Sequence, residues 1–198
     1  GHHRYETALN YRNYCRENGI SKPGDPQDFQ MIYLVDMEHP GLVVFPTHRL
    51  VRDLPNFDKE AVLEKCSEFF YIDEKEGTDT MEEDLKKLYD EGKKAFGFYC
   101  GKGEWFLLTL KNIDIMSQML PNVSKASQSL DVSVLHTLIL EKIFGIDKEN
   151  MAKQINLTYT KFFTEAIDGV DKGEFQCSFV LNPTSCLLYT SPSPRDAH

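Results

Sequence analysis

The first four residues, Gly1-His2-His3-Arg4, are of types that can hold an anion. Apolar residues at helical spacing predict a helix over residues 4–17, so this group lies at a helix start. A helix N-terminus presents unpaired N–H groups and a partial positive charge, and phosphate binds there readily. Gly1 would let the backbone approach a ligand, and the planar guanidinium of Arg4 could grip two oxygens. His2 and His3 could each donate a hydrogen bond. The spacing leaves a phosphate site and an ordinary polar helix start equally open.

A second polar group, Thr47-His48-Arg49, follows the apolar residues 42–45, which we predict to form a strand. A hydroxyl, an imidazole and a guanidinium at a strand end could form a second anion clamp. The alternative is a junction between a strand and a helix, in which Thr47 caps the helix and Arg49 is solvated. The chemistry of these three residue types alone favours the alternative.

The other polar residues give weaker indications. His136 falls on the apolar side of a predicted helix over 131–144, which favours a core histidine over a ligand. Asp131, at the start of that helix, is interpreted as its N-cap. The sequence has no Walker-type loop, no metal-ligand spacing and no Ser/His/Asp arrangement. We therefore predict no metal site of protein ligands, and spacing names no catalytic residue.

Composition excludes several classes of function. The 198 residues include 22 Lys and Arg against 31 Asp and Glu, a net charge of −9. Nonspecific nucleic-acid binding requires Lys and Arg to neutralise phosphates, so the acidic balance argues against it. No run of about 18 apolar residues is present that could span a membrane. Cys15, Cys66, Cys100 and Cys177 form no Cys-x-x-Cys pair, which predicts reduced, buried thiols and a cytoplasmic location.

The hydrophobic periodicity predicts both helices and strands. Helical spacing continues beyond the first helix over residues 58–69, 80–93, 131–144 and 161–170. Strand patterns occupy residues 29–37, 42–45, 95–100, 104–110, 155–159 and 175–181, and the first four of these read as two hairpins. The acidic run 73–84 is interpreted as a solvated face. This mixture predicts an α+β fold or a mixed-sheet α/β fold.

Four segments together carry a resemblance to a known family. They are Gly-His-His-Arg-Tyr-Glu-Thr-Ala at residues 1–8, Leu-Val-Val-Phe-Pro-Thr-His-Arg-Leu at 42–50, Leu-Asp-Val-Ser-Val-Leu-His at 130–136 and Leu-Asn-Pro-Thr at 181–184. In this order they resemble a bacterial family called domain of unknown function 1015, over residues 1–185. The resemblance raises the anion-clamp interpretation of Thr47-His48-Arg49 to equal standing with its alternative.

That family in turn resembles a superfamily of ParB-like and sulfiredoxin-like domains. Sulfiredoxin carries Gly-Cys-His-Arg, which matches here at Gly1, His3 and Arg4, while His2 replaces the redox cysteine. ParB carries Gly-Glu-Arg-Arg-Tyr, which matches at Gly1, Arg4 and Tyr5. The resemblance therefore implies nucleotide-phosphate binding without sulfiredoxin's redox chemistry. It also implies a fragment of a ParB/sulfiredoxin-like core followed by further α/β elements.

The resemblance divides the chain into three parts. Residues 1–116 would be the C-terminal part of a nucleotide-binding-like α/β domain with inserted hairpins and helices, and residues 130–185 a smaller α/β segment. The intervening Ser117 to Ser129 is rich in Ser, Asn, Gln and Pro and is the expected boundary. The chain starts inside a helix, so we expect a truncated, longer parent protein. Residues 186–196 resemble translated sequencing-adapter sequence, so we expect 186–198 to be a non-native tail.

Free serine kinases of the superfamily carry a similar Gly/His/Arg motif, and this gives a first hypothesis. The protein would be a phosphotransferase using ATP or ADP with Mg²⁺ on a small, serine-like hydroxyl substrate. Gly1, His2, His3 and Arg4 would hold phosphates, with Thr47, His48 and Arg49 as further binders. The acidic catalytic residue would precede Gly1. The alternative hypothesis is a non-catalytic, ParB-like module in which a nucleotide gates partner binding, and the third is a scaffold.

Overall fold

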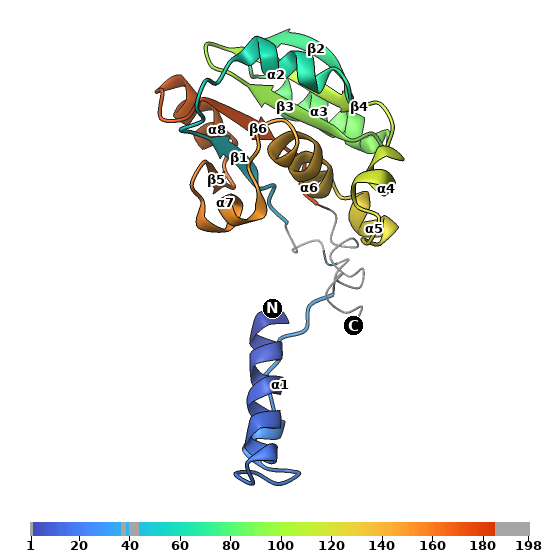
Figure 1. Cartoon of the computed structure of the whole chain (residues 1–198), viewed down its shortest axis with the longest axis vertical. Coiled ribbons are helices and arrows are strands. Elements are labelled where there is room, and N and C mark those ends of the chain that lie inside the picture. The colour runs from blue at the N-terminus through green and yellow to red at the C-terminus, as the bar shows by residue number, and fades with distance from the viewer. Residues whose placement is uncertain (1, 37–38, 40–43, 185–198) are drawn as a thin grey trace. The chain divides into compact units, whose positions relative to one another are not determined.

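The computed structural model describes residues 2–36, 39 and 44–184 (Figure 1). The chain divides into two compact units, Gly1–Leu42 and Val43–His198. The division into segments 1–116 and 130–185 with a boundary over Ser117 to Ser129 stays a prediction.

The first unit contains the helix α1 (His2–Glu17) and the 3₁₀ turn η1 (Pro26–Asp28). The helix confirms the prediction for residues 4–17, and Gly19, with φ at +68°, lies just beyond its end in the left-handed conformation that glycine adopts without strain. An ion pair of 2.6 Å between Arg16 and Asp28 joins the two elements, and Cys15 is buried.

The strand predicted over residues 29–37 is wrong for the residues 29–36 that are described. They lie in no strand, and large side chains such as Met31 and Leu34 are 94% and 86% exposed. A strand requires a neighbouring backbone to receive its hydrogen bonds, and apolarity along the chain does not supply one. Most of the predicted turn 38–41 and half of the strand 42–45 lie outside the described residues, and residues 44 and 45 lie in no strand.

The second unit is built on a six-stranded sheet in the order β2-β4-β3-β6-β1-β5. Its strands are β1 (His48–Val51), β2 (Phe70–Glu76), β3 (Ala95–Tyr99), β4 (Glu104–Leu110), β5 (Leu157–Thr160) and β6 (Cys177–Val180). Every neighbouring pair is antiparallel. With helices on the same unit this confirms the α+β class, whereas the mixed-sheet alternative is not realised.

Helices cover both faces of this sheet. Phe98 and Phe179 face one apolar cluster, which receives side chains from α2 (Lys59–Cys66), α4 (Ile115–Met119), α7 (Lys148–Lys153) and the helix α6 (Asp131–Val134) with its π-helical continuation η2 (Leu135–Glu141). Tyr99 and Val180 face a second cluster with α3 (Met81–Asp90) and α8 (Phe163–Asp171). Because both faces are covered, every residue of β1, β3 and β6 is buried.

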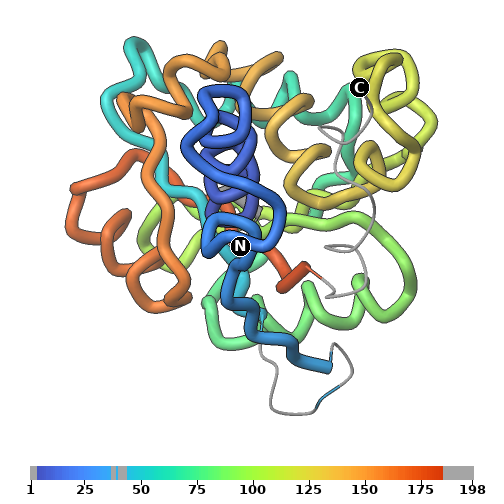
Figure 2. The backbone as a smooth tube through the Cα atoms, turned by 90° about the horizontal axis from the view of Figure 1, so that it is seen from below, coloured from blue at the N-terminus to red at the C-terminus, as the bar shows by residue number. Residues whose placement is uncertain are grey.

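Several elements of this unit were absent from the sequence prediction. The short helices α4, α5 (Lys125–Gln128) and α7 have too few turns to show a period, and α4 and α5 occupy much of the predicted boundary. In both views α5 and α8 lie on opposite sides of the unit (Figures 1 and 2). The strand β2 was not predicted, because it overlaps the acidic run 73–84. That run is mostly exposed, as predicted, and β2 lies at the edge of the sheet.

Three further predictions concern the chain as a whole. Within the described ranges, no helix combines the length and the apolarity needed to cross a bilayer. Cys15, Cys66 and Cys177 are free and buried and Cys100 is free and half-buried, close to the prediction of buried thiols. The predicted non-native tail 186–198 lies outside the described residues.

Candidate functional site

The first predicted anion group lies at the start of a helix, as expected. His2 and His3 belong to the first turn of α1, and Arg4 follows with an exposed side chain. Gly1 lies outside the described residues. The group is in the unit Gly1–Leu42, whereas Thr47, His48 and Arg49 are in the unit Val43–His198.

The second predicted group is divided by the alternation of strand β1. Arg49 shares a sheet face with Val51, which belongs to the cluster under η2, whereas Leu50 contacts α8 on the opposite face. His48 therefore points away from Arg49. No helix follows Thr47, so the predicted strand-to-helix junction with a solvated Arg49 is wrong: Arg49 is only 6% exposed.

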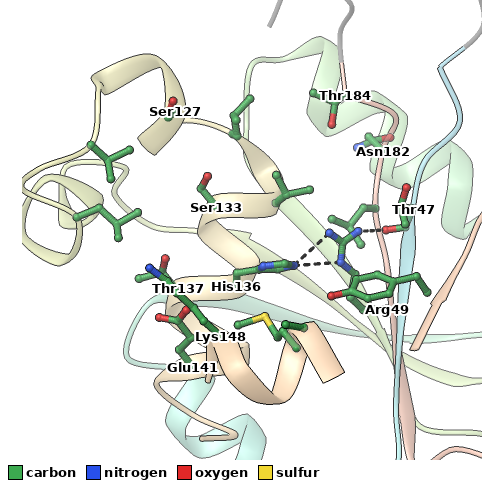
Figure 3. A pocket seen from close by; sticks show the side chains of 18 of the residues that line it. Thr47, Arg49, Ser127, Ser133, His136, Thr137, Glu141, Lys148, Asn182 and Thr184 are labelled. Carbon is green, nitrogen blue, oxygen red and sulfur yellow. Dashed lines mark hydrogen bonds between the residues drawn. The ribbon is translucent and has the colours of Figure 1, made fainter. Parts of the chain in front are cut away.

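Arg49 is held by two hydrogen-bond acceptors and an aromatic ring. Its Nε and Nη2 atoms lie 3.2 and 3.1 Å from Nε2 of His136, and Nη1 donates to the carbonyl oxygen of Thr47 (Figure 3). The guanidinium carbon is 5.1 Å from the centre of the Tyr159 ring. These contacts hold the planar fork of the guanidinium in one orientation.

His136 must accept these bonds, so its neutral ring carries its proton on Nδ1. Burial, reinforced by the charge of Arg49, lowers the pKa of His136 to about 4. The imidazole therefore remains a neutral acceptor for Arg49 at neutral pH. The predicted core histidine is instead half-buried, and it lines a cavity.

The cavity beside Arg49 has a volume of about 760 Å³, within the range of small-molecule sites. It lies between the ends of β1 and β6, strand β5, and the helices that cover this face (Figure 3). Its polar lining consists of Thr47, Arg49, Ser127, Ser133, His136, Thr137, Glu141, Lys148, Tyr159, Asn182 and Thr184. Among these described residues two side chains are cationic, Arg49 and Lys148, and one is a carboxylate, Glu141.

The π-helical turn η2 shapes one wall of the cavity. Its backbone bonds skip five residues, as in Lys142 N–H to the Thr137 oxygen at 3.3 Å. Leu135, Leu138 and Leu140 are buried in the core while His136, Thr137 and Glu141 line the cavity. Such wide turns occur often at functional sites, since they change which side chains of a helix share a face.

Several hydroxyls around Arg49 are available to a ligand. Within the described part of the chain, the hydroxyls of Thr47, Ser133 and Thr184 form no hydrogen bond to protein. Asn182 uses its amide nitrogen to donate to the Leu85 carbonyl at 2.9 Å, which leaves its oxygen for other partners. The cavity therefore offers donors grouped near a guanidinium.

His48 has a structural position on the other side of the sheet. It is 1% exposed, and its Nδ1 accepts from the Leu181 N–H at 3.2 Å, while Nε2 has no partner among the described residues. Burial, with a smaller effect from Arg49, lowers the pKa of His48 to about 4. His48 thus supports the strand end that carries Asn182 and does not line the cavity.

Sequence reasoning named Thr47 and Arg49 but missed the partners that complete the cavity. His136 and Asn182 lie in the third and fourth segments of the family resemblance, which was the available signal for them. The sequence carried no signal for Lys148 or Glu141, because charged side chains are ordinarily solvated. Asp131 is not an N-cap: it is the first residue of α6, and its carboxylate pairs with Lys94 at 2.8 Å.

Carboxylates and imidazoles do not gather into a metal cluster in the described segments: no group of three His, Cys, Asp or Glu there could hold an ion. Nor does a Mg²⁺–nucleotide complex require one, because Mg²⁺ keeps several waters and is usually bound through one or two carboxylates and the phosphates themselves. Glu141 lines the cavity and could supply one such carboxylate ligand.

The fold and the cavity define the class: an α+β protein with a cavity of polar and aliphatic side chains at one face of an antiparallel sheet. Comparison with family models matches residues 1–133, which is 133 of 198 residues, to the family described as "Protein of unknown function (DUF1015)". The chain belongs to this family. No curated protein and no solved structure matches it. The match includes Thr47 and Arg49 and ends in α6, before His136.

Proposed function

We propose that this protein binds a phosphorylated small molecule, and specifically a nucleotide, in the cavity beside Arg49. The observation that carries the proposal is a buried guanidinium, oriented by His136 and Thr47, in a cavity with unbonded hydroxyls. A buried, oriented arginine forms bidentate bonds to phosphate that are stronger than those of an exposed one.

The surroundings suit phosphate rather than a neutral ligand. Thr47, Ser133 and Thr184 can each donate to a phosphate oxygen, and Lys148 adds a second positive charge to the lining. The described lining carries one more cation than carboxylates, in a protein whose overall net charge is −9.

The chemistry implied by the resemblance can be related to this cavity. For a phosphotransferase, Arg49 and Lys148 would stabilise phosphate charge, and Glu141 would bind Mg²⁺ or orient a hydroxyl acceptor. Bound ATP or ADP with Mg²⁺ would supply the transferable phosphoryl group. A serine-like substrate and the ParB/sulfiredoxin-like core rest on the resemblance alone.

The start of α1 is the alternative location for the phosphate. Gly1, His2, His3 and Arg4 match the phosphate motif of the superfamily, and α1 is a sixteen-residue helix with a full N-terminal turn. The non-catalytic, nucleotide-gated module uses the same ligand, so turnover distinguishes it from the kinase.

The test is the binding of ATP, ADP and CTP by isothermal titration calorimetry to the wild type and to Arg49→Lys. Lysine keeps the charge but cannot form the fork to His136 and a phosphate together, so we expect affinity to fall about tenfold or more. Arg52→Lys is the matched control, because Arg52 is exposed on the same segment and outside the cavity lining.

Equal affinities for Arg49→Lys and wild type, with both folded by circular dichroism, would exclude the Arg49 cavity as the phosphate site. Incubation with ATP or ADP and free serine then separates the two hypotheses. A phosphorylated product supports the kinase, and nucleotide binding without turnover supports the gated module.

A further inference from the structure

The cavity beside Arg49 has a second, apolar side. Four aliphatic side chains from the stretch that runs from the end of α4 into α6 line it: Leu120, Val123, Leu130 and Val132. We call these four residues the aliphatic wall. In the close view Ser127, from the same stretch, stands across the cavity from Arg49 and Thr47 (Figure 3).

The aliphatic wall is held in place by one buried amide. Gln128, 7% exposed, donates from Nε2 to the carbonyl oxygens of Leu120 at 2.8 Å and Val123 at 2.9 Å. Its Oε1 accepts from the Ser117 hydroxyl at 3.0 Å. One side chain thus fixes the backbone at both residues that begin the wall. A preorganised apolar surface costs a ligand little ordering entropy.

A phosphate ion alone would not use this arrangement. Bound at Arg49, it would leave most of a 760 Å³ cavity to water in contact with aliphatic side chains. Apolar surface facing water is unfavourable by about 25 cal/mol per Å², so a ligand that covers the wall gains affinity. The volume and the wall together favour an ester with a sizeable apolar body.

We infer that the ligand is a phosphate monoester or nucleotide whose flat or aliphatic body packs against the aliphatic wall while its phosphate binds Arg49. This inference rests on the proposed function and adds the part of the ligand that determines selectivity. The wall selects against esters with polar bodies, because their hydroxyls would lose water without gaining partners on Leu and Val side chains.

The test compares three probes by calorimetry: inorganic phosphate, glycerol phosphate with a polar body, and phenyl phosphate with an apolar body. In the wild type, phenyl phosphate should bind about tenfold more tightly than glycerol phosphate, from the apolar area it covers. The double variant Val123→Thr/Val132→Thr adds hydroxyls to the wall at nearly constant shape. It should remove that preference and leave the affinity for inorganic phosphate unchanged.

The matched control is Val44→Thr, a half-buried valine outside the lining of this cavity, which should keep the wild-type preference. Equal binding of the two esters by the wild type overturns the inference, and so does a preference that survives the double variant. In both cases inorganic phosphate still binds and the proposed function stands. ATP titrated in parallel reports on the proposed function separately: if ATP binds and none of the three probes does, the inference alone fails, and if ATP does not bind either, the proposed function fails with it.

Discussion

The two arginines that sequence reasoning selected for anion binding lie in opposite environments. Arg4 is exposed on α1, and Arg49 is 6% exposed and fixed by His136, Thr47 and Tyr159. In water an exposed guanidinium gains little from a single anion, since solvent screens it, whereas a buried one gains more. Arg4 is therefore the less constrained of the two arginines in this structure.

The first prediction concerns His48, the buried neighbour of Arg49 in the chain. The imidazole of His48 stays neutral in the fold, with a pKa of about 4, against 6.5 for an exposed histidine. A depressed pKa for a base means that the unfolded chain binds more protons between these values. Stability should therefore fall as the pH drops from about 6.5 to 4, by about 2 kcal/mol between pH 7 and 5 for this residue.

Urea unfolding at pH 7 and pH 5 measures this loss. His136 has the same direction of shift and adds its own dependence, so the comparison is with His48→Gln. The glutamine oxygen can accept the Leu181 N–H in place of Nδ1, and it does not titrate. A pH dependence as steep in His48→Gln as in the wild type would contradict the assignment to His48.

The second prediction tests what orients Arg49. His136→Leu removes the acceptor of two guanidinium nitrogens, so Arg49 should lose its fixed orientation and ATP affinity should fall about tenfold. His136→Gln keeps an acceptor oxygen and should remain within about threefold of the wild type. Calorimetry at pH 7 reports both. If His136→Gln lost as much affinity as His136→Leu, the imidazole would have a role beyond orienting Arg49.

The difference between the two arginines also shows what sequence could and could not predict. Residues 95–110 were predicted correctly because a glycine turn joins two long apolar strands, and both signals are local. Residues 29–36 carry an equally apolar pattern but no strand, since pairing depends on a partner that the segment does not encode. The site is limited in the same way, because contacts between distant segments are not encoded locally. Thr47 and Arg49 could be selected from the sequence as a motif at a predicted strand end. His136, 87 positions from Arg49, becomes its hydrogen-bond partner only through the sheet and η2.

The last and smallest predicted effect concerns Arg4. If the phosphate binds beside Arg49, Arg4→Ala removes only an exposed charge on α1, and the affinity for ATP should change by less than about threefold. Calorimetry of Arg4→Ala beside Arg49→Lys measures the contrast directly. A loss of more than tenfold in Arg4→Ala, with Arg49→Lys unaffected, would transfer the phosphate site to the start of α1. In that event the cavity beside Arg49 would need a different ligand, and the helix start, rather than the buried guanidinium, would be the phosphate site of this protein.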